Sequence, residues 1–366
     1  MRCSPPSINY WHTLKQPLVK KCLRSCCDKQ LFSTQPTPKN EYKVTIPFHR
    51  LPLLVQVQAI RTMDPKDWLN EPNSSMIENA AILYQKMQNV FVFPDNLTIS
   101  FYANNGGKAT IRELLSNPVM KNWKNLNIFG QKVSSENLKM IMDTATSLRT
   151  LNSAVEKMPS NFKHENAFKF CNQIYNDARW VKIEDLYGLR DLIYVELRRT
   201  LFTQEQLKSL VNYWVNSEVD MFSELQIGTK SPNFKSLING FVGLQGSGPD
   251  SKYSKLFFTL SESSLNKRKR TMLRISFNVY WRSLSLMALD INEKYTPSKN
   301  EEDNKKFENV GMILTLLHKK KELEDLLEAA NEEAKMELSE TIDYLISKLS
   351  EFNVTFVDGK VTHQLF

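Results

Sequence analysis

The chain has 366 residues, of which 41% are hydrophobic and 10% aromatic, and it carries a formal net charge of +8. This length allows two or three domains of about 100–200 residues each, and the apolar fraction excludes disorder throughout the chain. No run approaches the ~20 consecutive apolar residues of a membrane-spanning helix, so the sequence predicts a soluble protein without a membrane anchor.

Residues 1–45 mix Pro, Ser, Cys and Lys without a helical or strand period, which predicts a flexible basic tail. Asp28 and Glu41 are its only acidic residues. The scarcity of acids also fits a mitochondrial presequence with a processing point near Leu31-Phe32-Ser33, so cytoplasmic or nuclear and mitochondrial locations stay open. The basic residues of the tail are Arg2, Lys15, Lys20, Lys21, Arg24, Lys29, Lys39 and Lys43.

The five cysteines are too few and too irregularly spaced for a disulfide framework. We therefore expect reduced thiols, as in the cytosol or nucleus. His12 with Cys22, Cys26 and Cys27 matches no structural zinc spacing, so we expect neither a metal nor another cofactor.

A new pattern begins at Ile46. The sequence predicts a helix over Leu51–Met63, and the break at Asp64-Pro65 follows because proline disfavours helix at the residue before it. Shorter apolar stripes predict helices over Lys66–Asn70 and Ser74–Gln88. Residues 46–90 therefore form a small helical module in this interpretation.

The helix predicted over Leu51–Met63 is apolar around most of its circumference. Leu51, Leu54, Val55 and Ala59 cover one side of an ideal helix, and Leu53, Val57 and Ile60 cover another. Such a helix requires burial on both sides, which a module of about 45 residues cannot supply alone. Either a partner protein or the downstream domain must cover the second side.

Residues 91–290 read as alternating short strands and helices. The helix over Thr203–Trp214 opens with a capping box between Thr203 and Gln206. A strand and helix that recur at about 25–30 residues are typical of leucine-rich-repeat-like solenoids, which offer an extended strand surface to another protein. An ordinary α/β domain is the alternative. The other predicted elements are strands over Leu97–Tyr102, Leu126–Phe129, Trp180–Ile183, Tyr194–Leu197 and Glu224–Ile227, and a helix over Ser135–Thr144.

Residues 231–265 are rich in Gly, Ser, Pro and Asn, which predicts loops. A strand over Leu273–Trp281 and a charged linker over Asn292–Asn304 follow. Residues 300–366 form an amphipathic helical region, with helices over Phe307–Leu317 and Lys320–Phe352. Their simplest role is a hairpin that caps the solenoid, because the heptads that a coiled coil needs are interrupted.

Part of the helical module resembles a known family. Phe48-His49-Arg50-Leu51-Pro52-Leu53-Leu54-Val55, followed by Ile60, Met63-Asp64-Pro65 and Asp67, resembles the F-box of the large nematode-type F-box family. The segment Ser74-Ser75-Met76-Ile77 departs from the Ser/Cys-Ser-Lys-Arg-like third helix of that family. A protein-interaction scaffold with a degenerate F-box is therefore an alternative.

A second resemblance lies downstream. Glu184-Asp185-Leu186-Tyr187-Gly188-Leu189, Val195-Glu196-Leu197, Leu207–Trp214 and Glu224-Leu225-Gln226-Ile227 are similar, in that order, to the type 2 F-box-associated region. That region reads as a leucine-containing strand, a helix that ends near a tryptophan, and a second strand.

Together, the two resemblances imply a substrate-recognition subunit of a Skp–cullin–F-box ubiquitin ligase. Its partners would be a Skp-type adaptor, through it a cullin, and a target protein. By family position, the adaptor-binding residues would be Leu51, Pro52, Leu53, Leu54, Ile60 and Met63. The expected fold class is α+β, with a small helical F-box, a degenerate leucine-rich-repeat-like α/β domain and C-terminal helices.

The sequence contains none of the common catalytic motifs that we searched for. The sequence holds no Walker loop, no dinucleotide-binding glycine motif, no His-Glu-x-x-His and no Gly-x-Ser-x-Gly. We therefore expect a chain that is not an enzyme by itself. The basic run Lys267-Arg268-Lys269-Arg270 is interpreted as a solvated loop, and nucleic-acid binding or nuclear import is its alternative.

Overall fold

The structure is a computed structural model, and all the residues that it describes belong to the second of the two units of the chain, Pro47–Phe366. The described residues are 75–90, 97–103, 110–229, 232–247, 254–262, 268–293, 295, 301–305, 307–357 and 360–363. The predicted tail and the first two helices of the predicted F-box lie outside these ranges. The third predicted helix, Ser74–Gln88, corresponds to α4 (Met76–Val90).

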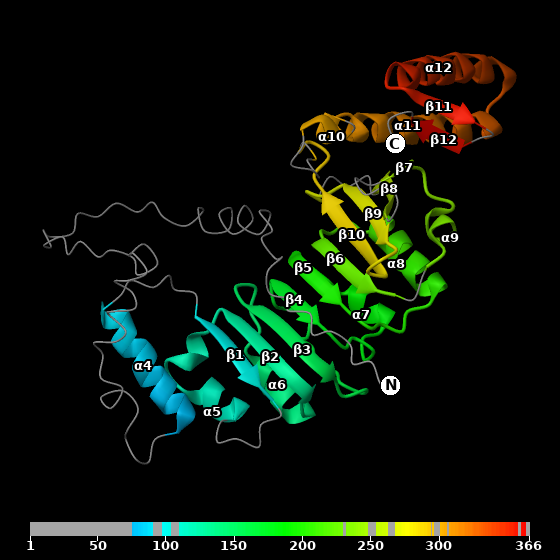
Figure 1. Ribbon diagram of the computed structural model, residues 1–366. Helices are drawn as coiled ribbons and strands as arrows, with labels where there is room; N and C mark the ends of the chain where they lie inside the picture. The colour runs from blue at the N-terminus through cyan, green and yellow to red at the C-terminus, as the bar shows by residue number, and fades with distance from the viewer. Residues whose placement is uncertain are drawn as a thin grey trace, which may run out of the picture. The chain divides into compact units, whose positions relative to one another are not determined.

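A ten-stranded sheet dominates the described part, and its first six strands are parallel. They lie side by side in chain order (Figure 1). Parallel neighbours require a crossover connection between each strand and the next, so strand and connection repeat along the chain. The six strands are β1 (Thr98–Tyr102), β2 (Asn125–Lys132), β3 (Thr150–Lys157), β4 (Asn172–Tyr175), β5 (Leu192–Leu197) and β6 (Phe222–Gly228).

Helices form most of these crossovers, and local capping explains where they begin. The side chains of Thr110, Ser134 and Thr203 each accept a hydrogen bond from the backbone N–H three residues later. The capping box between Thr203 and Gln206 is confirmed. The crossover elements are α5 (Ile111–Ser116), the short 3-10 helix η3 (Met120–Asn122), α6 (Ser135–Asp143), α7 (Ile183–Tyr187) and α8 (Gln204–Asn216).

The second part of the sheet is antiparallel. Strand β6 pairs with β10, and the sheet continues through β9 and β8 to β7. The short helix α9 precedes β7. The bounds of these elements are α9 (Phe234–Ile238), β7 (Leu244–Ser247), β8 (Ser254–Leu260), β9 (Met272–Asn278) and β10 (Ser283–Leu289).

Two apolar cores lie on opposite faces of the sheet. Leu126, Leu151 and Val195 pack in the first core with the crossover helices. Phe257 of β8 belongs to this first core, whereas its neighbours Leu256 and Phe258 belong to the second. Because successive strand residues point to opposite faces, the second core lies on the other side of β8.

The C-terminal elements build that second core. Helix α11 supplies Ile313, Leu314 and Leu317, which pack with Leu256 and Phe258 of β8. Helix α12 packs on α11, and a two-stranded hairpin follows it. The bounds are α10 (Glu301–Lys305), α11 (Val310–Ala329), α12 (Glu332–Glu351), β11 (Val354–Val357) and β12 (Lys360–His363).

The mixed α/β class that the sequence predicts is confirmed, but several predicted elements are wrong. Trp180–Ile183 is a turn that leads into α7, and 231–265 contains α9, β7 and β8 where loops were expected. The break predicted between Leu317 and Lys320 is absent, since α11 continues to Ala329. Within the described residues, no helix has both the length and the apolar character that a membrane span requires.

Candidate functional site

The residues predicted to bind the adaptor, Leu51, Pro52, Leu53, Leu54, Ile60 and Met63, lie outside the described residues. The strand surface predicted to bind a target protein lies within the described part. This surface is the face of β1–β6 that points away from the crossover helices, called the open face below.

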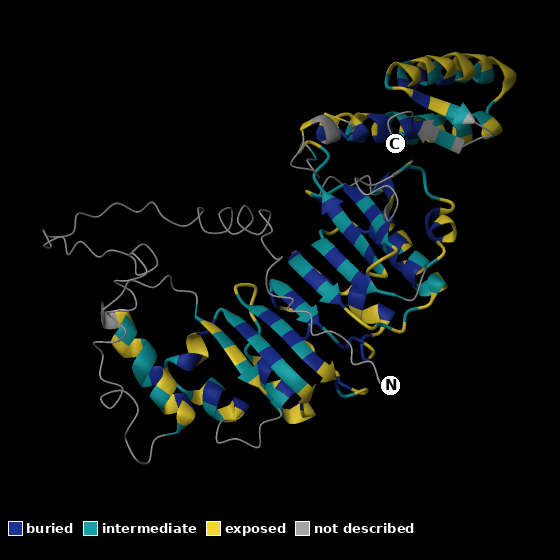
Figure 2. Ribbon diagram, in the orientation of Figure 1, coloured by how far each residue is buried: buried dark blue, intermediate teal, exposed yellow. Residues whose placement is uncertain are grey.

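Strict alternation separates the open face from the core. On β2, Leu126 and Ile128 are fully buried against the helices, whereas Asn125, Asn127 and Phe129 point to the other side and are half-buried. Figure 2 shows the alternation as buried and intermediate bands along the strands. The open face therefore carries side chains that the fold does not need for its core.

Hydrogen-bonded polar pairs line the first four strands of the open face. Asn125 Nδ2 donates to Thr98 Oγ1 over 3.0 Å, across the register of β1 and β2. Asn172 Nδ2 donates to Thr150 Oγ1 over 3.5 Å, across β3 and β4. Each amide thus bonds to the neighbouring strand and presents further donor and acceptor positions at the surface.

Carboxylates mark the β6 end of the open face, on β5 and β6. Glu196 accepts hydrogen bonds from Tyr194 Oη over 2.8 Å and from Arg198 Nε over 2.6 Å. Glu224, opposite Tyr194 on β6, accepts from Gln226 Nε2 over 2.7 Å. Burial and the nearby charge of Glu196 raise the pKa of Tyr194, so its hydroxyl stays a hydrogen-bond donor. This end of the open face is therefore a prearranged polar network.

An aromatic pair occupies the β1 end of the open face. The rings of Tyr102 and Phe129 stack with centroids 5.1 Å apart, and Tyr102 is 61% exposed. Aromatic side chains that remain exposed beside polar groups are typical of protein-recognition surfaces. At the other end of the sheet, the same face of β8 is covered by α11. The open face therefore extends from β1 to β6.

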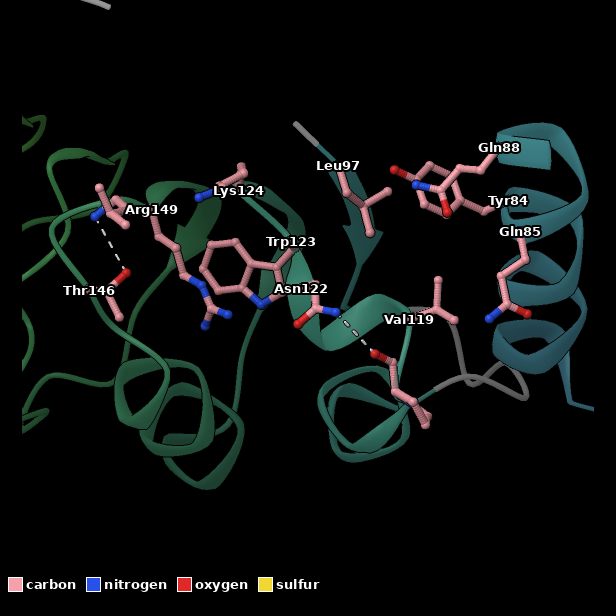
Figure 3. Close-up of a pocket in the computed structure, with 12 residues that line it drawn as sticks. Tyr84, Gln85, Gln88, Leu97, Val119, Asn122, Trp123, Lys124, Thr146 and Arg149 are labelled. Carbon is pink, nitrogen blue, oxygen red and sulfur yellow. Dashed lines mark hydrogen bonds between the residues drawn. The ribbon is translucent and has the colours of Figure 1, made fainter. Parts of the chain in front are cut away.

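A second feature is a cavity of about 640 Å³ beside the amino ends of β1, β2 and β3 (Figure 3). The guanidinium of Arg149 lies 4.5 Å from the ring centroid of Trp123. Its two terminal nitrogens donate to the carbonyls of Thr144 and Lys121, and burial lowers the pKa of Arg149. The described lining includes Lys124 and Arg149 but no carboxylate, so the cavity is positively charged. The residues that line it are Tyr84, Gln85, Gln88, Leu97, Pro118, Val119, Asn122, Trp123, Lys124, Thr146, Leu148 and Arg149.

The basic run predicted to form a solvated loop contains a core residue. Arg268 is 6% exposed, and its Nη1 donates to the carbonyls of Trp214 and Ser217. The backbone N–H groups of Lys269 and Arg270 donate to the carboxylate of Asp220. The prediction of a solvated basic loop is therefore wrong for Arg268, whereas the side chain of Lys269 is exposed. Lys267 lies outside the described residues.

Residues that bear reactive groups are scattered in the described part. There, no three His, Cys, Asp or Glu side chains come together as metal ligands. Cys171 precedes β4, and its Sγ donates to the carbonyl of Arg149 over 3.2 Å.

The four segments that resemble the type 2 F-box-associated region lie on consecutive elements. They fall on α7 and the turn after it, then on β5, α8 and β6. The helix of that resemblance, α8, carries Trp214 near its end. No protein-family model matches the chain, and no curated protein and no solved structure is similar to it. The family assignment therefore stays a prediction.

Proposed function

We propose that this chain is a substrate-recognition subunit of a Skp–cullin–F-box ubiquitin ligase, acting in the cytoplasm or the nucleus. The observation that carries the proposal is the run from Phe48 to Asp67, in which Leu51-Pro52, the apolar spacing and Met63-Asp64-Pro65 follow the F-box pattern in order. The predicted helix within this run has more apolar surface than a module of its size can bury.

The adaptor would contact Leu51, Pro52, Leu53, Leu54, Ile60 and Met63. Exposure of four or five such side chains to water would cost several kcal/mol at ~25 cal/mol per Å², so their burial by a partner is favourable. The same residues also pack the F-box itself. A substitution there therefore tests both roles together.

The downstream domain would hold the target. Its support is the stack of parallel strands in chain order, the arrangement of a degenerate leucine-rich-repeat-like solenoid, with an open face that carries polar and aromatic side chains. Such a face offers alternate strand side chains to another protein without any change in the core.

The chain would promote ubiquitin transfer by proximity. When the F-box region binds the adaptor and the open face binds the target, the target meets the ubiquitin-conjugating enzyme at a high effective concentration. No side chain of this chain takes part in a bond-making step in this mechanism. The rate would therefore depend on the two affinities and on geometry.

A co-purification experiment tests the proposal. The full chain should retain a purified Skp-type adaptor, and the double variant Leu53→Asp with Ile60→Asp should lose it, because two charges enter an apolar contact. Circular dichroism should show that the sheet of the double variant remains folded. If the wild-type chain fails to retain the adaptor at about 10 μM, the ligase proposal is wrong.

The alternative with specific support is a scaffold whose F-box no longer binds the adaptor. It rests on Ser74-Ser75-Met76-Ile77, which departs from the family's third helix. A nucleic-acid-binding role loses support, since Arg268 of the basic run is buried against Trp214 and two of its neighbours are held by Asp220. Partners that are proteins are therefore favoured over nucleic acid.

A further inference from the structure

The turn between β9 and β10 places large apolar side chains in solvent. Val279, Tyr280 and Trp281 are 51%, 72% and 61% exposed. The two rings contact each other edge to face, with centroids 4.9 Å apart. Turns of this kind usually carry small or polar residues, so three consecutive exposed apolar residues need a reason other than turn geometry.

The end of β5 is attached to this turn through Gly228 and Thr229. Thr200 N donates to the carbonyl of Gly228, and Thr229 N donates to the carbonyl of Arg282. A Cβ on Gly228 would lie 3.2 Å from Arg198 Cα, so glycine permits the close approach. Leu201, next to Thr200, is 66% exposed. Two segments distant in sequence thus form one surface at the carboxyl ends of β5 and β6.

Two arginines belong to this surface. Arg199 and Arg282 have φ angles of 50° and 48°, in a left-handed region that costs free energy for any residue except glycine. Arg199 donates from Nε and Nη2 to the backbone carbonyls of Asn176 and Glu156. Among the described residues, neither arginine has a carboxylate partner. The surface therefore keeps positive charge beside its aromatic rings.

We propose that this surface, called the arginine–aromatic rim, binds an acidic segment of a partner protein. The partner segment would supply one or two apolar side chains for the aromatic rings and flanking carboxylates for the arginines. The rim consists of Arg199, Leu201, Val279, Tyr280, Trp281 and Arg282. This inference rests on the proposed function, for which it names the chemistry of the target. Trp, Tyr and Arg are the residues that dominate protein–protein binding energy. The arginine forks suit carboxylates, which bind them bidentately.

The occupant is a protein segment and not a nucleic acid for a reason of charge. A single strand binds along a groove with cations at successive phosphates. Within the described part of the chain, Arg199 and Arg282 lack a carboxylate partner, while Arg198 is paired with Glu196 and Arg179 with Asp177. A short acidic segment needs one or two cations and an apolar contact, and the rim offers both.

A peptide selection tests the rim. A displayed library of random peptides of about twelve residues would be selected on the full chain, and the enriched peptides measured by fluorescence anisotropy. Enriched peptides should combine Asp or Glu with Leu, Phe or Trp. Trp281→Ala and Arg282→Glu should each weaken their binding at least about tenfold, because an anchor and a charge partner are lost.

Matched variants at exposed positions outside the rim serve as controls. Tyr344 is 60% exposed on α12, and Arg112 is exposed on α5 beside Glu136. Tyr344→Ala and Arg112→Glu should leave the affinity of the enriched peptides unchanged. Equal losses in the rim and control variants would contradict the inference, as would enrichment of peptides without acidic residues.

Two further measurements separate the rival outcomes. An oligothymidine of about twenty nucleotides that binds the wild-type chain and loses affinity with Trp281→Ala would overturn the inference in favour of nucleic acid. Adaptor co-purification with the same rim variants should be unchanged. If the adaptor binds and no acidic peptide does, the rim inference fails alone. If acidic peptides bind the rim and the adaptor does not, only the ligase proposal fails.

Discussion

The guanidinium of Arg268 lies 3.9 Å from the centroid of the Trp214 ring and donates from Nη1 to the backbone carbonyls of Trp214 and Ser217. These carbonyls belong to the end of α8, where a positive charge also offsets the helix dipole. Burial lowers the pKa of Arg268 to about 10, and the charge of Asp220 acts in the opposite direction. Arg268 therefore joins α8, the crossover helix between the parallel strands β5 and β6, to the segment that precedes β9.

Replacement of Arg268 by alanine should destabilise the protein by about 2–4 kcal/mol. The variant loses a buried cation–π contact and the charged donor to two helix-end carbonyls. Urea unfolding followed by tryptophan fluorescence measures the loss. A change of less than about 0.5 kcal/mol would mean that the stack contributes nothing to stability.

Lys269→Ala is the matched control in the same basic run. The side chain of Lys269 is 66% exposed and lies 3.6 Å from Glu293. An exposed ion pair of this kind contributes about 0–1 kcal/mol, so Lys269→Ala should unfold at nearly the wild-type urea concentration.

Asp177, two residues after the end of β4, predicts a pH dependence of stability. Burial acts to raise its pKa, but hydrogen bonds from Arg179 and from the backbone N–H of Met158 outweigh burial and lower the pKa below 3.8. A carboxyl whose pKa falls on folding stabilises the fold above its unfolded pKa, and this stability is lost as pH falls through the folded pKa. Asp177→Asn should therefore cost about 2 kcal/mol at neutral pH and less below about pH 4.

The control for Asp177 is Asp143→Asn. Asp143 also has a hydrogen-bond partner, His164, but the side chain of Asp143 is 68% exposed. Its loss should cost at most about 1 kcal/mol. An equal cost for the two substitutions, or a cost for Asp177→Asn that does not shrink in acid, would contradict the assignment.

Two buried histidines should make the C-terminal part sensitive to acid. Burial lowers the pKa of His318 on α11 and of His363 on β12. The charge of Glu262 and a backbone hydrogen bond to Val242 act against it at His318, and a backbone hydrogen bond to Phe352 does so at His363. A histidine whose pKa falls on folding is protonated more readily when unfolded, so stability decreases as pH falls from about 6.5 through the folded pKa.

The variant His318→Gln with His363→Gln tests this dependence. Thermal unfolding at about pH 7.5 and pH 5.5 should show a smaller pH difference in the variant than in the wild type. An identical difference would show that these histidines do not set the acid response.

Substitution by alanine should destabilise the protein at Gly228 but not at Gly188. A Cβ at Gly228 would lie 3.2 Å from Arg198 Cα and Arg199 N, both backbone atoms that cannot rotate away. Gly228→Ala should cost about 1–3 kcal/mol. At Gly188, with φ of −81°, a Cβ would meet only Asp185 O at 3.5 Å. Gly188→Ala should therefore be neutral or stabilise the protein by about 0.4–1 kcal/mol in the same urea unfolding assay. A cost at Gly188 that equals the cost at Gly228 would contradict this reading.

Elements with local signals could be predicted from the sequence. Helix α8 is an example, because Thr203 and Gln206 form a capping box and Leu207, Leu210 and Val211 lie on one face. Strand β5 follows the same logic, with Val195 and Leu197 buried on one side. These signals involve neighbours in sequence, so no tertiary information was needed.

Other elements depend on contacts that the sequence does not reveal. Strand β4 reads Asn-Gln-Ile-Tyr, and its fully buried Gln173 reverses the expected alternation. Trp180–Ile183 is a mostly apolar run like a short strand, but Val181 N donates to the carbonyl of Ala178 and closes a turn before α7. The arginine–aromatic rim was also missed, since it joins residues about 80 positions apart that are brought together by the pairing of β5 with β6 and of β6 with β10.

The central claim is that Leu51–Met63 presents an apolar side to a Skp-type adaptor. The most direct test is a calorimetric titration of the full chain with the purified adaptor, together with the variant Leu53→Asp with Ile60→Asp. We expect one-to-one binding at about 1 μM or tighter for the wild type, and no binding for the variant. Absence of binding to the wild-type chain at about 100 μM adaptor would contradict the claim, as would equal affinity for the two chains.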